Sequence, residues 1–282
     1  MLMQQYDSRV PSPLMDDRSR TLRRMVIDAL DGGGRGHLGS SLSLIEILRV
    51  LYDDVLHYKA DEPQWQQRDR FVLSKGHGCL ALYAVLADKG FFPVDALRQF
   101  CRQGSFLGGH PERGKVPGVE ASTGALGHGL SIAVGMALAA RIKQQSHRLF
   151  VEMGDGEINE GSVWEAAMCA AKHALSNLSI LVDYNKLQSY GPNSEVQPLE
   201  PLADKWRAFG FETIEIDGHD ISALKKALQE PLATDKPSAI ICHTVKGKGI
   251  PFAENQATWH HKSNMLPEDI TEMYNALEAY DA

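Results

Sequence analysis

The second half of the chain alternates between short, continuous apolar runs and segments whose apolar residues recur with helical spacing. Buried parallel strands have this appearance, because helices cover both faces of the sheet and leave it no polar side. The pattern therefore predicts an α/β fold: a doubly wound, mostly parallel sheet with helices on both faces. The predicted strands are 71–74, 149–153, 178–184, 211–216 and 238–244, and the predicted helices between the later strands are 162–175, 202–210 and 221–228.

The first half of the chain is more helical. In residues 41–55 the apolar side chains recur at helical spacing, and Ser43 stands where an N-cap would be expected. No internal repeat, low-complexity tract or change of composition divides the sequence, so we expect one compact domain over residues 18–282. The polar residues 1–17 are expected to form an N-terminal arm.

Composition narrows the possible partners. The 282 residues are 43% hydrophobic, which is enough for one large folded domain. A net charge of -7 without a Lys/Arg-rich run predicts no nucleic-acid partner, and the apolar runs are too short to cross a bilayer. The N-terminus does not have the pattern of a secretion signal. Cys79, Cys101, Cys169 and Cys242 are spaced too widely for a metal or redox pair, so we expect reduced, buried thiols in a cytoplasmic protein.

The candidate chemistry follows two of the predicted strands. Gly154-Asp155-Gly156 comes directly after strand 149–153, and Asn185 comes directly after strand 178–184. Because the carboxyl ends of parallel strands meet at one edge of a sheet, we expect Asp155 and Asn185 to lie side by side. Carboxylate and amide oxygens are the ligands that Mg²⁺ prefers, and glycines allow a diphosphate to approach the backbone closely. The pair therefore predicts a metal-bridged diphosphate site.

Two other interpretations of the same residues are open. Asp155 could simply cap a helix. Alternatively, Gly154-x-Gly156 could belong to a dinucleotide site in which Asp183 binds a ribose. The dinucleotide fingerprint requires a third glycine where this chain has Asn159, and an acid at position 155 would repel a pyrophosphate unless a cation intervened.

These motifs resemble the thiamine diphosphate motif of the transketolases, enzymes that move a two-carbon ketol unit between sugars. The motif consists of "GDGEINEG" followed by "DYNKLQSYG", and four further stretches agree in family order over roughly residues 18–265. These stretches are "GHLGSSLSLIEIL" at 36–48, "FVLSKGHG" at 71–78, "GGHPERGKVPGVEASTGALGHGLSIAVGMA" at 108–137 and "WHHK" at 259–262.

The resemblance implies a thiamine-diphosphate-binding fold of the type that holds the diphosphate. It implies that the Asp155 and Asn185 side chains and the Leu187 carbonyl bind Mg²⁺, with Ca²⁺ or Mn²⁺ as alternatives. Gly154 and Gly156 would lie against the diphosphate.

The resemblance also assigns residues to the rest of the cofactor. Gly124 and Leu126 would line its aminopyrimidine and thiazolium side, and His77 would also contact it. Glu160 would serve catalysis and cofactor binding in the glutamate network that joins two active sites across an interface.

Four histidines match the substrate histidines of the family, namely His37, His77, His110 and His260. The residues themselves support the first three, because each lies beside glycine in a loop, and imidazole titrates near working pH. His260 is preferred to the adjacent His261 because it aligns with the aromatic-His pattern. Two departures from the family, His128 and Tyr184, affect no assigned ligand.

The resemblance further implies an incomplete site. Full transketolases continue with a pyrimidine-binding domain and a C-terminal domain, whereas this sequence matches only the first domain. We therefore expect the N-terminal subunit of a split transketolase that uses sugar phosphates, forms an α2β2 heterotetramer and is active only with its C-terminal partner subunit. The alternative is a subunit of another thiamine diphosphate enzyme, such as a 2-oxoacid dehydrogenase α chain or a ketol-acyl transferase.

Overall fold

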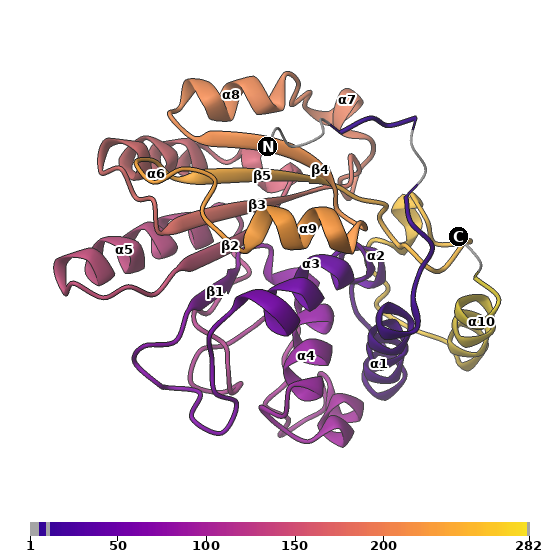
Figure 1. Cartoon of the computed structure of the whole chain (residues 1–282). Coiled ribbons are helices and arrows are strands. Elements are labelled where there is room, and N and C mark those ends of the chain that lie inside the picture. Colours follow the sequence, from indigo (N-terminus) through magenta and orange to yellow (C-terminus); the bar gives the residue numbers. More distant parts are fainter. Residues whose placement is uncertain (1–5, 10–11, 281–282) are drawn as a thin grey trace.

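A five-stranded parallel sheet lies at the centre of the chain (Figure 1). The computed structural model describes residues 6–9 and 12–280, so parts of the predicted arm and the last two residues of the predicted domain lie outside the described residues. The strand order is β1-β2-β3-β5-β4. The strands are β1 (Arg70–Leu73), β2 (Leu149–Gly154), β3 (Leu178–Tyr184), β4 (Glu212–Asp217) and β5 (Ser238–His243).

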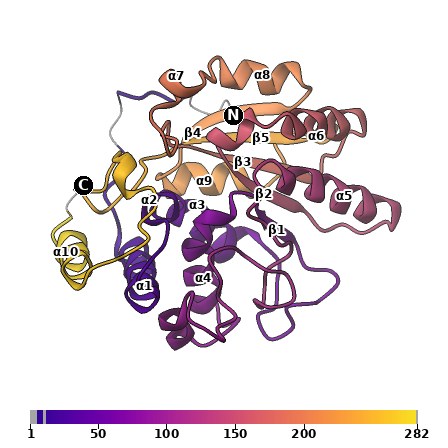
Figure 2. The same ribbon diagram turned by 180° about the vertical axis from the view of Figure 1, so that it is seen from behind.

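Helices cover both faces of this sheet, as the two opposite views show (Figures 1 and 2), which confirms the predicted doubly wound α/β class. One face carries α5 (His128–Ile142), α6 (Gly161–Lys172) and α8 (Leu202–Ala208). The other face carries α3 (Ile45–Val50), α4 (Cys79–Asp88) and α9 (Ile221–Leu228), with α1 (Asp17–Gly33) and α10 (Pro267–Glu278) packed side by side further out. The short helices are α2 (Leu38–Leu42) and α7 (Asn193–Val196).

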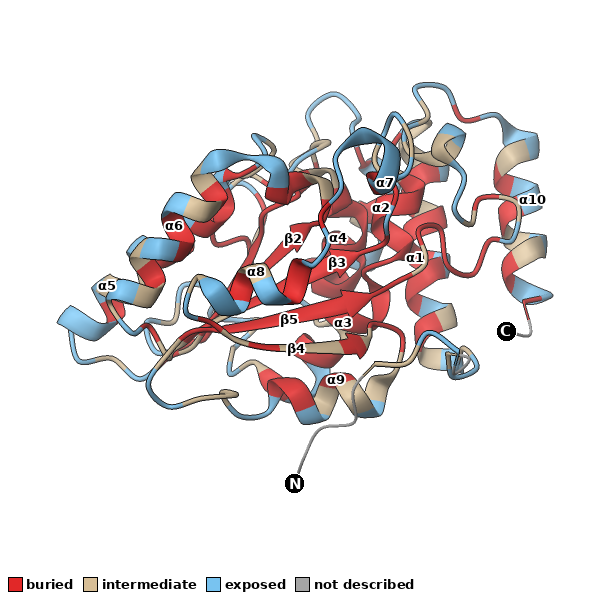
Figure 3. Cartoon of the chain, turned by 90° about the horizontal axis from the view of Figure 1, so that it is seen from above, coloured by how far each residue is buried: buried red, intermediate tan, exposed pale blue. Residues whose placement is uncertain are grey.

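Two hydrophobic cores form because successive strand residues face opposite sides. Val151 and Met153 of β2 belong to the core beneath α5 and α6, whereas Phe150 belongs to the core beneath α3 and α4. Every residue of β2 is buried, and Figure 3 shows β2, β3 and β5 buried between helices whose outer faces are exposed, whereas the edge strand β4 is partly exposed. The predicted strands are therefore continuous apolar runs because helices cover both faces of the sheet, as expected.

The predicted helix over 41–55 is interrupted. Helix α2 ends at Leu42, α3 begins at Ile45, and a π-helical turn occupies Leu51–Val55. The prediction that Ser43 is an N-cap is wrong, because its hydroxyl donates instead to the carboxylate of Asp183, at 2.7 Å. A buried carboxylate from a distant strand is a stronger acceptor than the local backbone.

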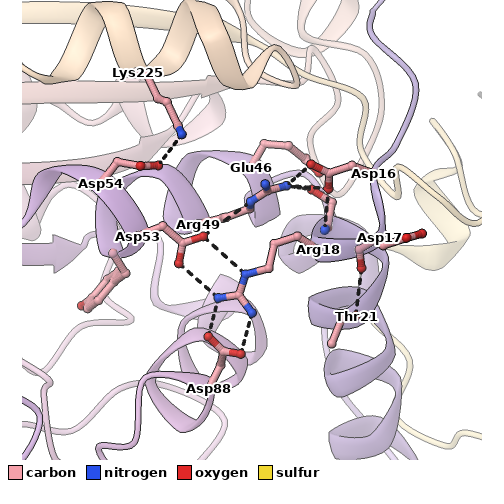
Figure 4. A network of polar contacts seen from close by, with 12 residues as sticks. Asp16, Asp17, Arg18, Thr21, Glu46, Arg49, Asp53, Asp54, Asp88 and Lys225 are labelled. Atoms are coloured by element: carbon pink, nitrogen blue, oxygen red, sulfur yellow. Dashed lines mark hydrogen bonds and ion pairs between the residues drawn. The ribbon is translucent and has the colours of Figure 1, made fainter.

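Charged side chains join the N-terminal helices to one another (Figure 4). Arg18 of α1 bonds to both Asp53 of the π-helical turn and Asp88 at the end of α4. Arg49 of α3 bonds to Asp16, the N-cap of α1. These side chains are partly exposed, and the network joins helices that the hydrophobic core already holds together.

The four cysteines are free thiols, and Cys79 and Cys242 are buried as predicted. The prediction of burial is wrong for Cys101, which is exposed in a turn, and for Cys169, which is partly exposed on α6. Hydrophobic neighbours in the sequence do not distinguish the two faces of an amphipathic helix. Over the described residues, no helix combines the length and the apolarity that spanning a membrane would require.

Candidate functional site

Asp155 and Asn185 lie on adjacent loops at the carboxyl edge of the sheet, as the strand order predicts. Asp155 follows β2, Asn185 follows β3, and the paired strands place Gly154 opposite Asp183. The backbone N–H of Lys186 donates to Asp155 Oδ2 at 2.5 Å, which ties the two loops together. Lys186 has φ of 66°, a left-handed conformation that a non-glycine residue adopts only where its surroundings enforce it.

Around these loops lies a pocket with about 610 Å³ of space not filled by protein atoms. Nine of the residues assigned from the sequence line it: His37, His77, Leu126, Gly154, Asp155, Gly156, Asn185, Leu187 and His260. These residues come from positions 37 to 260 of the sequence, and the fold brings them together at one edge of the sheet.

The other three assigned residues lie outside the lining of this pocket. His110 is exposed, with its ring centroid 6.5 Å from that of His37. It lies beside Gly124, where an added Cβ would come within 2.8 Å of the His110 ring. Glu160 is exposed at the N-cap of α6, against Gly127, and its assignment to an inter-site network remains a prediction.

The pocket histidines form a compact group. Ring centroids are 5.2 Å apart for His37 and His77, and 5.5 Å apart for His260 and each of these two. Burial, reinforced by neighbouring positive groups, lowers the pKa of His37 to about 4 and that of His260 to about 3, and lowers the pKa of His77 as well. The three rings are therefore neutral at physiological pH and can each donate one hydrogen bond and accept another.

His260 and His261 are placed differently. His260 lines the pocket, and its buried Nδ1 has no hydrogen-bond partner within the described structure. His261 is exposed and outside the lining, although its ring centroid is only 4.5 Å from that of His37. The geometry therefore favours His260 as the residue that meets a ligand deep in the pocket.

The oxygen atoms near Asp155 suit a hard divalent cation. Asp155 is 3% exposed, and burial followed by the charge of Asp183 raises its pKa to about 6. A nearby cation would stabilise this carboxylate. Within residues 6–9 and 12–280, no three His, Cys, Asp or Glu side chains form a metal cluster, so a metal here would depend on one carboxylate, the Asn185 amide and backbone carbonyls.

The donors in the pocket suit an anion. The ammonium group of Lys246 donates to the Leu187 carbonyl at 2.6 Å, which places its positive charge in the pocket beside this carbonyl. The buried Nε2 of Gln188 has no hydrogen-bond partner in the described part of the chain. A Cβ on Gly156 would lie 3.0 Å from the Gln188 side chain, so glycine keeps the backbone accessible at this point. The residues therefore fit a cation bridged to a diphosphate.

The sequence analysis missed six polar residues that line the pocket, namely Ser40, Lys75, Glu157, Gln188, Ser189 and Lys246. Burial, then the charge of Lys75, lowers the pKa of Lys246 to about 8. A signal for both lysines was available, because "SKGHG" follows β1 and "TVKGKG" follows β5 at the same carboxyl edge. Applying the strand-end rule to every strand would have found them.

The structure weakens both other interpretations of the Gly154-Asp155-Gly156 motif. Asp155 accepts the N–H of Gly156 at 2.7 Å in a cap-like contact, but its second oxygen accepts from the loop after β3. Asp183 is fully buried and its carboxylate accepts hydrogen bonds from four side chains, so it cannot reach the ribose of a dinucleotide.

Comparisons with known proteins agree with this geometry. Residues 16–280 match the family described as transketolase, thiamine diphosphate binding domain. The chain is 42% identical to the 6-deoxy-6-sulfo-D-fructose transketolase subunit SqwG of Clostridium sp. (strain MSTE9), and the match covers 88% of this chain and 90% of that protein. It is 41% identical to an apulose-4-phosphate transketolase subunit of Phocaeicola vulgatus, over 86% of this chain and 87% of that one.

Solved structures show the same fold. The chain superposes on a mutant transketolase (R525L) of Pichia stipitis with a TM-score of 0.86 and 29% sequence identity. The superposition covers 94% of this chain but only 40% of the yeast enzyme, so the chain spans less than half the length of that protein.

Proposed function

This chain belongs to the transketolase family through its thiamine diphosphate binding domain, and on that premise we propose that it is the N-terminal subunit of a two-subunit transketolase. The observation that carries the proposal is the pocket at the carboxyl edge, where Asp155, Asn185 and the neutral histidines meet. The relatives named as transketolase subunits match along about their whole length, at 90% and 87%, which supports a separate subunit.

We assign the diphosphate end of thiamine diphosphate to the loops after β2 and β3. Asp155, the Asn185 amide and the Leu187 carbonyl would bind Mg²⁺, and Lys246 would add positive charge on the side of the diphosphate. Gly154 and Gly156 would lie against the phosphates. Gly124, Leu126 and His77 would lie toward the rest of the cofactor.

The histidines would bind and orient the sugar substrate. When bound, the cofactor supplies the carbanion chemistry that cleaves a ketose and carries its two-carbon unit. Neutral His37 and His260 can each donate a hydrogen bond to one hydroxyl while accepting a hydrogen bond from another, which orients a polyol without adding charge. His110, at the more exposed edge of the group, would bind the donor sugar or transfer a proton to it.

The partner and setting are part of the proposal. We expect a second chain with the pyrimidine-binding and C-terminal domains, two copies of each chain in the assembly, and sugar phosphates as substrates. The names of the two relatives include a phosphorylated and a sulfonated sugar, which supports a substrate with a terminal anionic group. Free thiols fit a protein of the reducing cytoplasm. Residues 18–282 would form the single domain of this subunit.

The test is calorimetric titration of the purified chain with thiamine diphosphate, with and without Mg²⁺, and with NAD as the comparison. We expect Mg²⁺-dependent binding of thiamine diphosphate and no binding of NAD. If the partner subunit is present and thiamine diphosphate still does not bind, the proposal is wrong.

A further inference from the structure

Asp183, at the carboxyl end of β3, is a buried acceptor with an unusual number of donors. Its side chain is fully buried, and its Oδ2 accepts the Ser43 hydroxyl at 2.7 Å and the Asn185 Nδ2 at 2.9 Å. The Lys75 ammonium also bonds to Oδ2, and the Thr244 hydroxyl bonds to Oδ1. The proposed function gives this residue no part.

These four donors come from four separate segments of the chain. Ser43 follows α2, Lys75 follows β1, Asn185 follows β3 and Thr244 follows β5. One carboxylate therefore connects the loops that form the floor of the pocket. Such a hub could be purely structural, but one of its contacts determines the orientation of a residue that lines the pocket.

That contact is the bond from Asn185. A carboxylate that holds an ammonium and two hydroxyls offers only acceptor atoms, so the amide must turn its NH₂ group toward Asp183. The amide oxygen of Asn185 then faces the other way, where it accepts the Leu187 N–H at 3.1 Å and keeps a second lone pair. Were the amide flipped, its NH₂ group would point at the cation and its oxygen at the carboxylate.

We propose that Asp183 is a positioning residue, which fixes the side-chain amide of Asn185 with its oxygen turned toward the metal position. This inference rests on the proposed function, in which the Asn185 oxygen binds Mg²⁺. Partners that orient metal ligands are typically worth about 10–100-fold in metal affinity. We therefore expect Asp183→Asn to raise the Mg²⁺ concentration needed for half-maximal thiamine diphosphate binding by about 10–100-fold.

A second effect has to be separated from positioning. Removing the charge of Asp183 takes away the closest ion-pair partner of Lys75 and leaves Glu152, whose nearest oxygen is 3.7 Å from the ammonium. The excess positive charge would repel Mg²⁺ whatever the orientation of Asn185. A double-mutant cycle distinguishes the two effects, because a positioning effect vanishes once Asn185 is gone and an electrostatic effect persists.

The experiment measures Mg²⁺-dependent thiamine diphosphate binding by titration calorimetry on the full chain with its partner. The variants are Asp183→Asn, Asn185→Ala and the double variant. Val182→Ala, a buried change on the same strand with its side chain in the opposite core, is the control for lost stability. If Asp183→Asn costs little in the Asn185→Ala background, the inference is supported. Fully additive losses, or no loss in the single variant, would overturn it.

Asn185→Asp covers the case in which Asp183→Asn does not fold. This variant gives the metal a second carboxylate but cannot donate to Asp183. A higher Mg²⁺ concentration for half-maximal thiamine diphosphate binding than in the unmodified chain supports positioning, and an equal or lower concentration overturns it. Failure of the unmodified chain and partner to bind thiamine diphosphate would instead refute the proposed function, so the two failures are distinguishable.

Discussion

The ammonium group of Lys246 donates a hydrogen bond to the backbone carbonyl of Leu187, at 2.6 Å. Lys246 follows β5, and Leu187 lies in the loop after β3. Since β3 and β5 are neighbours in the sheet, a residue almost sixty positions away in sequence meets the loop proposed to bind the metal. The contact places a positive charge at the point where a diphosphate would bind.

Lys246→Met should therefore weaken thiamine diphosphate binding about tenfold or more, because a hydrogen bond to a charged group contributes about 1.5–3 kcal/mol. Titration calorimetry at saturating Mg²⁺ measures this loss. Lys248→Met is the matched control, since Lys248 is two residues away and its ammonium lies over the ring of Tyr280 instead. Equal losses in both variants would contradict a specific role for Lys246.

Asp155→Asn should leave the fold intact and raise the Mg²⁺ requirement for cofactor binding by at least about tenfold. The reason is that it removes the only carboxylate from the proposed oxygen shell. The measurement is cofactor affinity at limiting Mg²⁺. Asp217→Asn, at the end of the edge strand β4, is a control with the same chemical change. An unchanged Mg²⁺ requirement in Asp155→Asn would refute the assignment of the metal ligand.

His110→Ala should lower turnover with a ketose donor by about 100-fold or more, as expected when a positioned proton-transfer or hydrogen-bonding group is lost. Cofactor affinity should change much less, because His110 lies outside the lining of the pocket. Steady-state kinetics with the partner subunit present provide the test. Full activity in this variant would show that His110 has a structural role only.

Much of this arrangement could be predicted from the sequence. Strand β3 was predicted with its observed bounds, because Ile180, Leu181 and Val182 form a continuous apolar run that ends at the polar Asp183. The adjacency of Asp155 and Asn185 follows from parallel pairing alone. Glycine on either side of Asp155 indicated close approach by a ligand.

The remainder depends on contacts between distant segments. Ser43 was predicted to cap a helix, yet it bonds to Asp183, 140 positions further along the chain. Lys75 and Lys246 were missed because a lysine after a strand usually faces water, and only the packed loops bury these two. Local patterns report propensity and periodicity, whereas such buried pairs arise when several loops meet at one edge.

The pocket histidines should make stability depend on pH. Burial, followed by Lys246, His37, Lys75 and His261, lowers the pKa of His260 to about 3 from 6.5. Below about pH 6.5 the unfolded chain then binds this proton and the folded chain does not, so folding loses stability as pH falls. Asp155, whose pKa is raised to about 6, changes stability with pH in the opposite direction. The test therefore compares the pH dependence of the unmodified chain with that of a variant that lacks His260.

We therefore expect the free energy of unfolding of the unmodified chain to fall more steeply between about pH 7 and pH 5 than that of His260→Gln. Denaturant unfolding at the two pH values measures this difference, with His173→Gln, at the C-cap of α6, as the control. Parallel pH dependences for the unmodified chain and His260→Gln would contradict the low pKa.

The chain by itself should show no ketol transfer. The pocket contains groups suited to a metal, a diphosphate and a sugar, whereas the wall near Leu126 is open, with that side chain 38% exposed. Two relatives that match along most of their length are named subunits, and the Pichia stipitis transketolase is only 40% covered. Apolar side chains also lie exposed on α5 and α6, among them Ile142 at 80% and Met168 at 56%, as expected for surface that another chain covers.

Activity assays with and without the partner test this dependence. At saturating thiamine diphosphate and Mg²⁺, ketol transfer should be detected only after the partner is added, with a maximum near one copy of each chain. Light scattering should then give the mass of two copies of each chain, because most oligomers close with two-fold symmetry. Robust transfer by a verified partner-free preparation would overturn the two-subunit proposal, while leaving the assignments of Asp155 and Asn185 to be judged by their own tests.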